Sequence, residues 1–321
     1  MGSSGSRLPR YSGPCSVGSY DLEVPLQKPL IFGKSKLKGT NGQPAFQLET
    51  VLCTLFYPVN PDIASGKGRG KQYANPYWLE RPNSEISAGY LKFAGKQNAS
   101  RIYSVVLAAF VFLFGRSIKI PSFSAAPLAS NGGAGLSDDA GKNEQIEKYK
   151  VIIFSHGLAG TRRTYSQYCG EMASRGFVVV ALESRDGTAP STRIYNREGQ
   201  RKMRLDWIAH DDLEWSGGKE LKSLQVRAEQ LKLRVHEVSA VLEALDAIVS
   251  GKQVEHFRAS LQPDFDWKPW RNRLDLHGVA MAGHSFGSAT TINVLKERGL
   301  KERFSRGICL DPVSPNQSSA D

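Results

Sequence analysis

The chain has 321 residues, of which 40% are hydrophobic, and this is enough apolar material for one sizeable core. Its 31 glycines and 16 prolines are ordinary numbers, which excludes a fibrous or wholly disordered protein. The net charge of +11 would suit nucleic acid or an anionic membrane, but no zinc-finger spacing, RNP-like motif or long basic helix supports a nucleic-acid partner.

The cysteines and the first residues bear on compartment and cofactors. The cysteines lie far apart and form no CxxC pair: Cys15, Cys53, Cys169 and Cys309. This spacing argues against a disulfide framework and a metal site, so we expect a reducing, cytoplasmic location and neither metal nor cofactor. The first six residues, MGSSGS, fit the N-myristoylation pattern with Gly2 as acceptor, although an expression scar can look similar. Acylation of Gly2 would associate the protein with membranes.

The first 147 residues predict few regular elements. Residues 1–45 are expected to lie extended on the surface, and Phe46 to Tyr57 to form a strand that ends at Pro58. Ile102 to Phe114 is the most apolar run, but it falls short of the roughly 20 residues that span a bilayer. We expect a buried helix there, with an interfacial helix as the alternative. Residues 121–147 have a low-complexity composition and are expected to form a flexible surface insertion.

The second half alternates between strand and helix patterns. Short apolar runs, typical of strands buried on both faces, occupy Val151 to Phe154, Phe177 to Leu182, Leu274 to Ala282 and Gly307 to Leu310. Helices are predicted at Thr164 to Arg175, Gln225 to Val249 and Ala289 to Lys296. Because helices separate the strands, we predict a mostly parallel central sheet in a single α/β domain that covers residues 1–321.

The strongest chemical signal is the GxSxG motif Gly283-His284-Ser285-Phe286-Gly287, which lies between a predicted strand and a predicted helix. In that setting the chain turns sharply and presents the serine at the end of the strand, and the glycines leave room for the turn. The motif therefore predicts an α/β-hydrolase fold with Ser285 as its nucleophile.

A serine nucleophile needs a base, an acid that orients the base, and donors for the oxyanion. Asp311 follows the strand after the serine, where the acid of this fold is expected; the alternative is a turn residue before Pro312. The predicted oxyanion donors are the backbone N–H groups of Phe286 and of Leu158. His156 precedes Leu158 in the same turn, so we do not expect it to act as the base.

These segments together resemble the platelet-activating factor acetylhydrolase family, which has plasma and intracellular members. The matching pieces, in family order, are GPCSVG (13–18), LFYP (55–58), FSHGL (154–158), SRGFVV (174–179), Arg185-Asp186, GHSFG (283–287) and GICLD (307–311). The resemblance implies calcium-independent hydrolysis of a short or oxidised sn-2 acyl ester of a phospholipid. It also implies an interfacial surface near Ile102 to Phe114 and the roles already given to Ser285, Asp311, Leu158 and Phe286.

One departure concerns the base. The family's catalytic histidine lies well past the aspartate, whereas the histidines of this sequence are His156, His210, His236, His256, His277 and His284. We therefore expect a C-terminally incomplete domain, without its last strands and the catalytic histidine, and little activity from this chain. The alternatives are a non-catalytic lipid-binding relative and a general carboxylesterase that acts on non-lipid esters.

Overall fold

The computed structural model describes residues 7–60, 63, 73–96, 101–130, 148–196, 198–215, 222–252, 254 and 265–312. The predicted acylation site at Gly2 lies outside the described residues, as do residues 131–147 of the expected insertion.

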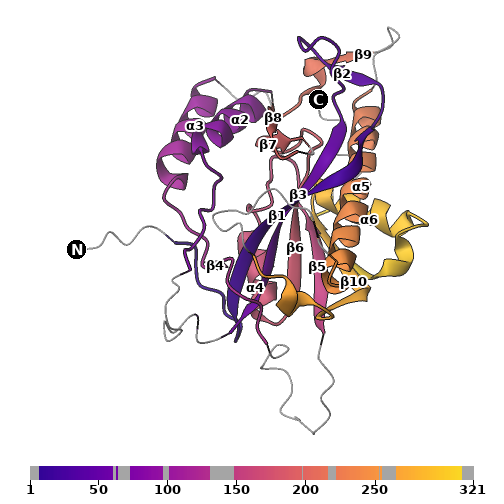
Figure 1. Ribbon diagram of the computed structural model, residues 1–321. Coiled ribbons are helices and arrows are strands. Elements are labelled where there is room, and N and C mark those ends of the chain that lie inside the picture. Colours follow the sequence, from indigo (N-terminus) through magenta and orange to yellow (C-terminus); the bar gives the residue numbers. More distant parts are fainter. Residues whose placement is uncertain are drawn as a thin grey trace, which may run out of the picture.

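A twisted sheet forms the centre of the molecule (Figure 1). Within the described residues it contains seven strands in the order β11 (Phe304–Leu310), β10 (Leu274–His284), β5 (Tyr149–Ser155), β6 (Val178–Glu183), β3 (Gln47–Val59), β1 (Ser16–Ile31) and β4 (Phe123–Ser124). The strands from β11 to β6 run parallel, whereas β3 is antiparallel to both β6 and β1. This mostly parallel sheet, with helices on both faces, confirms the predicted α/β-hydrolase fold.

Helices cover the two faces of the sheet and explain its continuous apolar strands. On one face, α4 (Ser166–Ser174) packs against Val179 and Ala181 of β6. On the other face, α5 (Ser223–Val249) and α6 (Phe286–Lys296) enclose a larger core that includes Val178 and Val180. Successive side chains of β6 therefore enter different cores, and every position of this strand is buried. Gly176 has φ +96° just after α4, a backbone conformation that glycine adopts readily where a helix ends.

Smaller elements lie outside the central sheet. β7 (Ser191–Tyr195) pairs with β8 (Arg201–Asp206), and β2 (Ser35–Leu37) pairs with β9 (Leu213–Trp215). Among the described residues, short 3₁₀ turns occupy His210–Asp212, Lys268–Trp270 before β10, and Lys301–Arg303 before β11.

The prediction that residues 1–45 lie extended on the surface is wrong for residues 17–23. β1 is a long strand of the central sheet, and residues 17–23 are all buried. The strand carries two carboxylates, which are unusual in a buried segment. Inside the fold Asp21 pairs with Arg162 and Glu23 pairs with Arg185. A buried charge is tolerated where a partner neutralises it.

Residues 121–130 also belong to the fold and not to a surface insertion. β4 pairs with β1, and Ser122, Ala126 and Leu128 are buried. The hydroxyl of Ser122 shares a 2.8 Å hydrogen bond with that of Ser19 on β1. Small residues at these positions allow close packing, which a low-complexity composition does not reveal.

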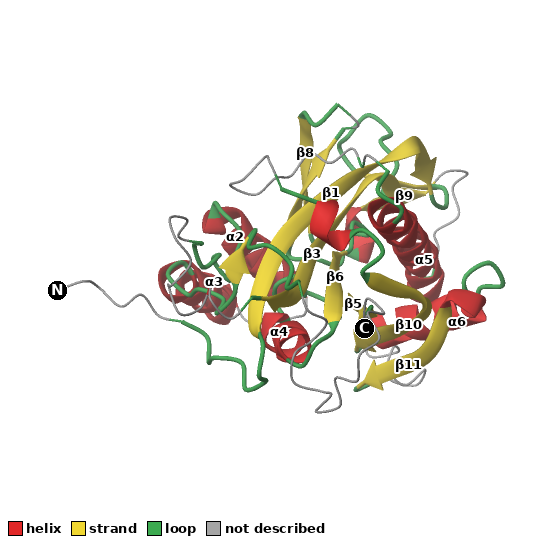
Figure 2. Cartoon of the chain, turned by 60° about the horizontal axis from the view of Figure 1, so that its bottom comes forward, coloured by secondary structure: helices red, strands yellow, loops and turns green. Residues whose placement is uncertain are grey.

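The apolar run around residues 102–114 forms a helix, but the expected burial is wrong. α2 (Asn83–Lys96) and α3 (Arg101–Gly115) form a helical pair that projects from one side of the sheet in Figures 1 and 2. Side chains along α3 remain exposed, with fractions of 78% at Ile102, 60% at Val106, 58% at Phe110 and 60% at Phe114. Among the described residues, no helix combines the length and apolarity that crossing a membrane requires.

Candidate active site

Ser285 occupies the sharp turn between β10 and α6. Its backbone has φ 52° and ψ −116°, a conformation that residues with a side chain rarely adopt. Its N–H donates to the carbonyl oxygen of Leu310 at 2.9 Å, and its own carbonyl accepts from the Ser288 N–H at 2.9 Å. These bonds hold the strained turn and place the serine at the carboxyl edge of the sheet.

Both glycines of the motif are required by close packing. A Cβ on Gly283 would overlap the carbonyl oxygen of Gly287, and a Cβ on Gly287 would overlap that of Ser155. The turn therefore lies directly against the end of β5. The expectation that glycines make room for the turn has this physical basis.

The predicted oxyanion turn lies beside the serine. A Cβ on Gly157 would stand 3.1 Å from the Cβ of Ser285, which places the two segments in van der Waals contact. Among the described residues, the Leu158 N–H has no hydrogen-bond acceptor. The Phe286 N–H belongs to the first turn of α6, where N–H groups have no partner within the helix. Both N–H groups therefore have the free hydrogen that the predicted role of oxyanion donor requires.

His156 is fully enclosed and has both ring nitrogens engaged. Nδ1 lies 2.8 Å from the carbonyl oxygen of Gly157, and the Ser184 N–H donates to Nε2 at 3.1 Å. Burial, together with the nearby Arg234 cation, lowers the pKa of His156 to about 3. This environment supports the view that His156 is not the base.

Asp311 stands at the same edge of the sheet as the serine. It follows β11, and its carboxylate lies 3.9 Å from Nε2 of His284 with 90% of its side chain exposed. Nδ1 of His284 forms a 2.7 Å hydrogen bond with the Tyr165 hydroxyl. Within the described part of the chain, the Ser285 hydroxyl has no side-chain hydrogen-bond partner, and no group of three or more His, Cys, Asp or Glu side chains could hold a metal ion.

A buried polar cluster that was not predicted from the sequence lies beneath this edge. Arg234 projects from α5 and donates to the carbonyl oxygen of His156 at 2.7 Å and to Asp186 at 2.7 Å. On α5, Gln230, Arg234 and Glu237 share the buried face with apolar residues such as Val238 and Leu242. Polar residues at core positions of an otherwise apolar stripe were the available signal.

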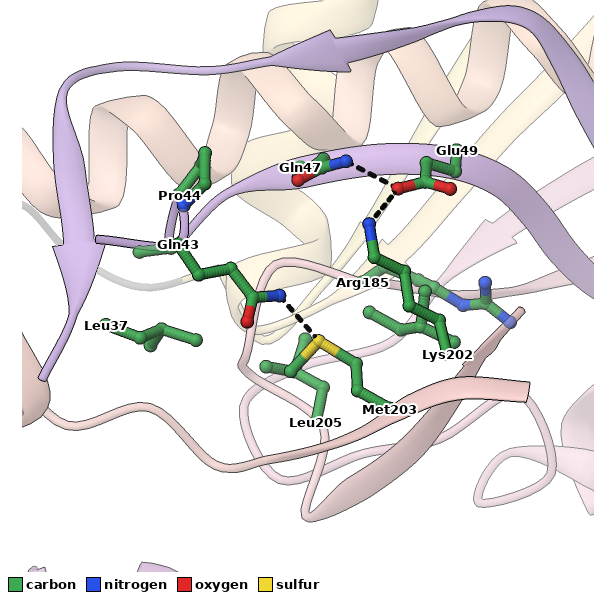
Figure 3. Close-up of a pocket in the computed structure, with 11 residues that line it drawn as sticks. Leu37, Gln43, Pro44, Gln47, Glu49, Arg185, Lys202, Met203 and Leu205 are labelled. Carbon is green, nitrogen blue, oxygen red and sulfur yellow. Dashed lines mark hydrogen bonds and ion pairs between the residues drawn. The ribbon is translucent and has the colours of Figure 1, made fainter. Parts of the chain in front are cut away.

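A small cavity lies apart from these residues, between the start of β3 and the β7–β8 hairpin (Figure 3). Glu49 accepts hydrogen bonds from Gln47 and Lys202 at its rim, and Gln43 contacts the sulfur of Met203. Its volume of about 20 Å³ has room for about one water molecule. None of the predicted site residues lines it.

Comparisons with known proteins identify relatives. The family model described as platelet-activating factor acetylhydrolase, isoform II, matches residues 1–315. A platelet-activating factor acetylhydrolase from Cavia porcellus is 31% identical over 306 residues, which cover 95% of this chain and 55% of that protein. One from Bos taurus is 30% identical over 307 residues, with the same coverage. The chain thus spans about half the length of the curated relatives it matches.

Among solved structures, a ferulic acid esterase from Streptomyces cinnamoneus is similar with a TM-score of 0.49 and 15% sequence identity, over 92% of this chain and 60% of that one. The family match covers nearly the whole sequence and agrees with the motifs and the sheet. The chain therefore belongs to the platelet-activating factor acetylhydrolase family.

Proposed function

We propose that this chain carries the nucleophile and oxyanion hole of a serine esterase that hydrolyses the short or oxidised sn-2 acyl ester of phospholipids without calcium. The observation that carries the proposal is the contact between Ser285 and the turn that presents Leu158. The family match supports a phospholipid substrate.

In the proposed reaction, Ser285 Oγ attacks the sn-2 carbonyl carbon while a base removes the hydroxyl proton. The carbonyl oxygen becomes an oxyanion that accepts hydrogen bonds from the N–H groups of Leu158 and Phe286. The bond to the glycerol oxygen then breaks, and that oxygen leaves with the proton as lysophospholipid. Water repeats the sequence on the acyl-enzyme, releases the short acid and restores the serine.

Among the described residues, no histidine side chain forms a hydrogen bond with the Ser285 hydroxyl, so the proposed base has no assigned residue here. Asp311 is proposed to orient a histidine, as the family resemblance implies. Since loss of a triad member removes several orders of magnitude of rate, we propose that the 321-residue chain by itself turns over slowly. Imidazole added to the solution should then act as a substitute base and raise the rate.

The test compares the chain with its Ser285→Ala variant in buffers with and without imidazole and a calcium chelator. Substrates are an sn-2 acetyl phospholipid, a long-chain sn-2 phospholipid and p-nitrophenyl acetate. We expect imidazole-stimulated, chelator-insensitive hydrolysis that needs Ser285 and prefers the acetyl phospholipid to the long-chain lipid. Equal rates in the variant would refute the nucleophile, and a preference for the soluble ester would indicate a general carboxylesterase. Vesicle binding without Ser285-dependent hydrolysis would indicate a non-catalytic lipid binder.

We further propose that α3 contacts the surface of a lipid aggregate. The exposed apolar side chains of α3 can insert into a lipid–water interface, whereas the helix is too short to cross a bilayer. Arg81 and Arg116, both exposed, stand at its C-terminal end, where the Arg81 side chain donates to the Arg116 carbonyl at 2.8 Å. Cationic groups beside an apolar surface favour anionic lipid. A myristoyl group on Gly2 would supply a second signal, because one acyl chain binds membranes only marginally.

A further inference from the structure

Arg234 is a buried arginine whose donors converge on the back of the active-site turn. Its side chain is fully enclosed. Nη1 donates to the carbonyl oxygen of His156 at 2.7 Å and to the hydroxyl of Ser155 at 3.1 Å. Nε donates to Asp186 at 2.7 Å, and Nη2 donates to the hydroxyl of Thr188. One guanidinium thus joins α5, the loop after β6 and the loop after β5.

We propose that Arg234 is a positioning residue of the oxyanion hole, which it holds through the backbone of His156 and the ring of Phe286. The inference rests on the proposed esterase function and concerns how its two oxyanion donors are kept in place. Arg234 itself touches neither the serine hydroxyl nor the substrate.

The first route runs through the peptide units that precede Leu158. Arg234 holds the carbonyl of His156, and the hydrogen bonds of the His156 ring assign its proton to Nδ1, which donates to the carbonyl of Gly157. That carbonyl and the Leu158 N–H belong to one planar trans peptide and point in opposite directions. Fixing the direction of the Gly157 carbonyl therefore also fixes that of the Leu158 N–H, which points the opposite way, toward the proposed site.

The second route runs through the other donor. The guanidinium carbon of Arg234 lies 4.7 Å from the centre of the Phe286 ring, within range of a cation–π contact. Phe286 is the first residue of α6, directly after the nucleophile. The same cation therefore contacts the residue that carries one predicted oxyanion donor and the backbone two residues before the other.

The surroundings keep Arg234 rigid. Burial alone would raise the pKa of Asp186, but Arg234 and Thr188 hold it below its ordinary value, so the ion pair stays charged. The Gln230 side chain donates to the backbone carbonyl of Asp186 at 2.8 Å. A buried ion pair is costly to desolvate and adds little net stability. Its geometry here suits the placement of a catalytic turn.

Arg234→Lys tests the proposal, with Arg185→Lys as the matched control. A lysine can keep its charge near Asp186, but its single ammonium cannot also reach the His156 carbonyl. Arg185 is equally buried and pairs with Glu23 at 2.8 Å, but it makes no hydrogen bond to residues 155–158. We expect both variants to lose stability, and only Arg234→Lys to lose kcat, by about 10- to 100-fold with KM unchanged.

The kinetics are measured on the acetyl phospholipid with added imidazole. Thr188→Val is a milder second variant, because it removes one anchor of Arg234 and keeps the side-chain shape. If Arg234→Lys does not fold, Thr188→Val must still lower kcat at least about threefold at constant KM. A folded variant with wild-type kcat, or a change in KM alone, would overturn the positioning role. Absence of Ser285-dependent hydrolysis in the wild-type chain would instead overturn the esterase proposal, and the positioning role with it.

Discussion

Gly287 lies so close to the end of β5 that a Cβ on it would overlap the backbone carbonyl oxygen of Ser155. Neither backbone can move without disturbing the nucleophile turn or the oxyanion turn. The absence of a side chain at Gly287 thus lets the predicted nucleophile turn pack directly against the predicted oxyanion turn.

Gly287→Ala should therefore destabilise the protein by about 2 kcal/mol or more, since overpacking of a tight interior forces backbone shifts. Urea unfolding followed by fluorescence measures the change in free energy. Gly299→Ala is the control, because a Cβ at Gly299 meets no atom within 4 Å. Similar midpoints for the two variants would show that the contact is looser than described.

Replacing the nucleophile should affect stability in a way that depends on the new residue. At φ 52°, Ser285→Gly relieves backbone strain, whereas Ser285→Ala retains it. Both variants should be inactive, yet the glycine variant should be more stable than the alanine variant by about 1 kcal/mol. Thermal unfolding of the pair measures the difference. An alanine variant of equal or greater stability would argue against strain at this position.

Exposed aromatic residues on α3 should govern binding to vesicles. The rings of Phe110 and Phe114 lie 4.8 Å apart, and their double replacement by serine should weaken partitioning onto anionic vesicles about tenfold or more. Thermal stability should hardly change, because both side chains are already exposed. Leu224→Ser removes an apolar side chain of comparable exposure from α5 and should bind like the parent. Co-sedimentation at low and high salt makes the comparison, and unchanged pelleting of the double variant would exclude α3 as the contact.

Glu237 should make stability depend on pH. Burial, reinforced by the nearby Asp186 carboxylate, raises the pKa of Glu237 from about 4.5 to about 8. Between these values the folded protein keeps a proton that the unfolded chain has released, so stability falls as pH rises from about 5 to 8. The loss is at most about 1.4 kcal/mol per pH unit.

Glu237→Gln should flatten that decline, because an amide does not ionise and its oxygen can still accept the 2.7 Å hydrogen bond from the Arg185 N–H. Urea unfolding at several pH values compares it with Glu243→Gln, an exposed position on the same helix. Parallel pH profiles for the wild type and Glu237→Gln would contradict the raised pKa.

Much of the fold could be read from the sequence because its signals are local. Continuous apolar runs predicted β5, β6 and β10, and the GxSxG motif predicted the turn at Ser285. The failures arose where a distant partner decides the outcome. β1 carries Asp21 and Glu23, which sequence analysis assigned to the surface because their arginine partners lie more than 140 residues away. The apolar composition of residues 102–114 predicted a helix. It could not show that many of the apolar side chains of α3 would stay exposed.

The site divides in the same way. Ser285, Leu158 and Phe286 were predicted from a motif and its neighbours. Arg234, by contrast, comes from a distant helix and contacts the His156 carbonyl and the Phe286 ring near them. The presence of an arginine at position 234 does not by itself reveal which backbone turn its side chain will contact. Only the packing of α5 across the sheet brings that guanidinium to the His156 carbonyl.

The register between β10 and β11 sets how far Asp311 lies from Ser285 along the edge of the sheet. His284 stands opposite Leu310, so the proposed nucleophile Ser285 and the proposed acid Asp311 each come one residue after the end of adjacent strands. Each residue of a strand advances about 3.3 Å, and a slip of two positions would carry the carboxylate about 7 Å along the edge. Evolution can lengthen or shorten the connection between α6 and β11, residues 297–303, only if the strands still meet at the same positions. Insertions or deletions in residues 297–303 that keep the strand pairing should leave the proposed site unchanged. Insertions or deletions of the same length inside β11 should move Asp311 away from Ser285.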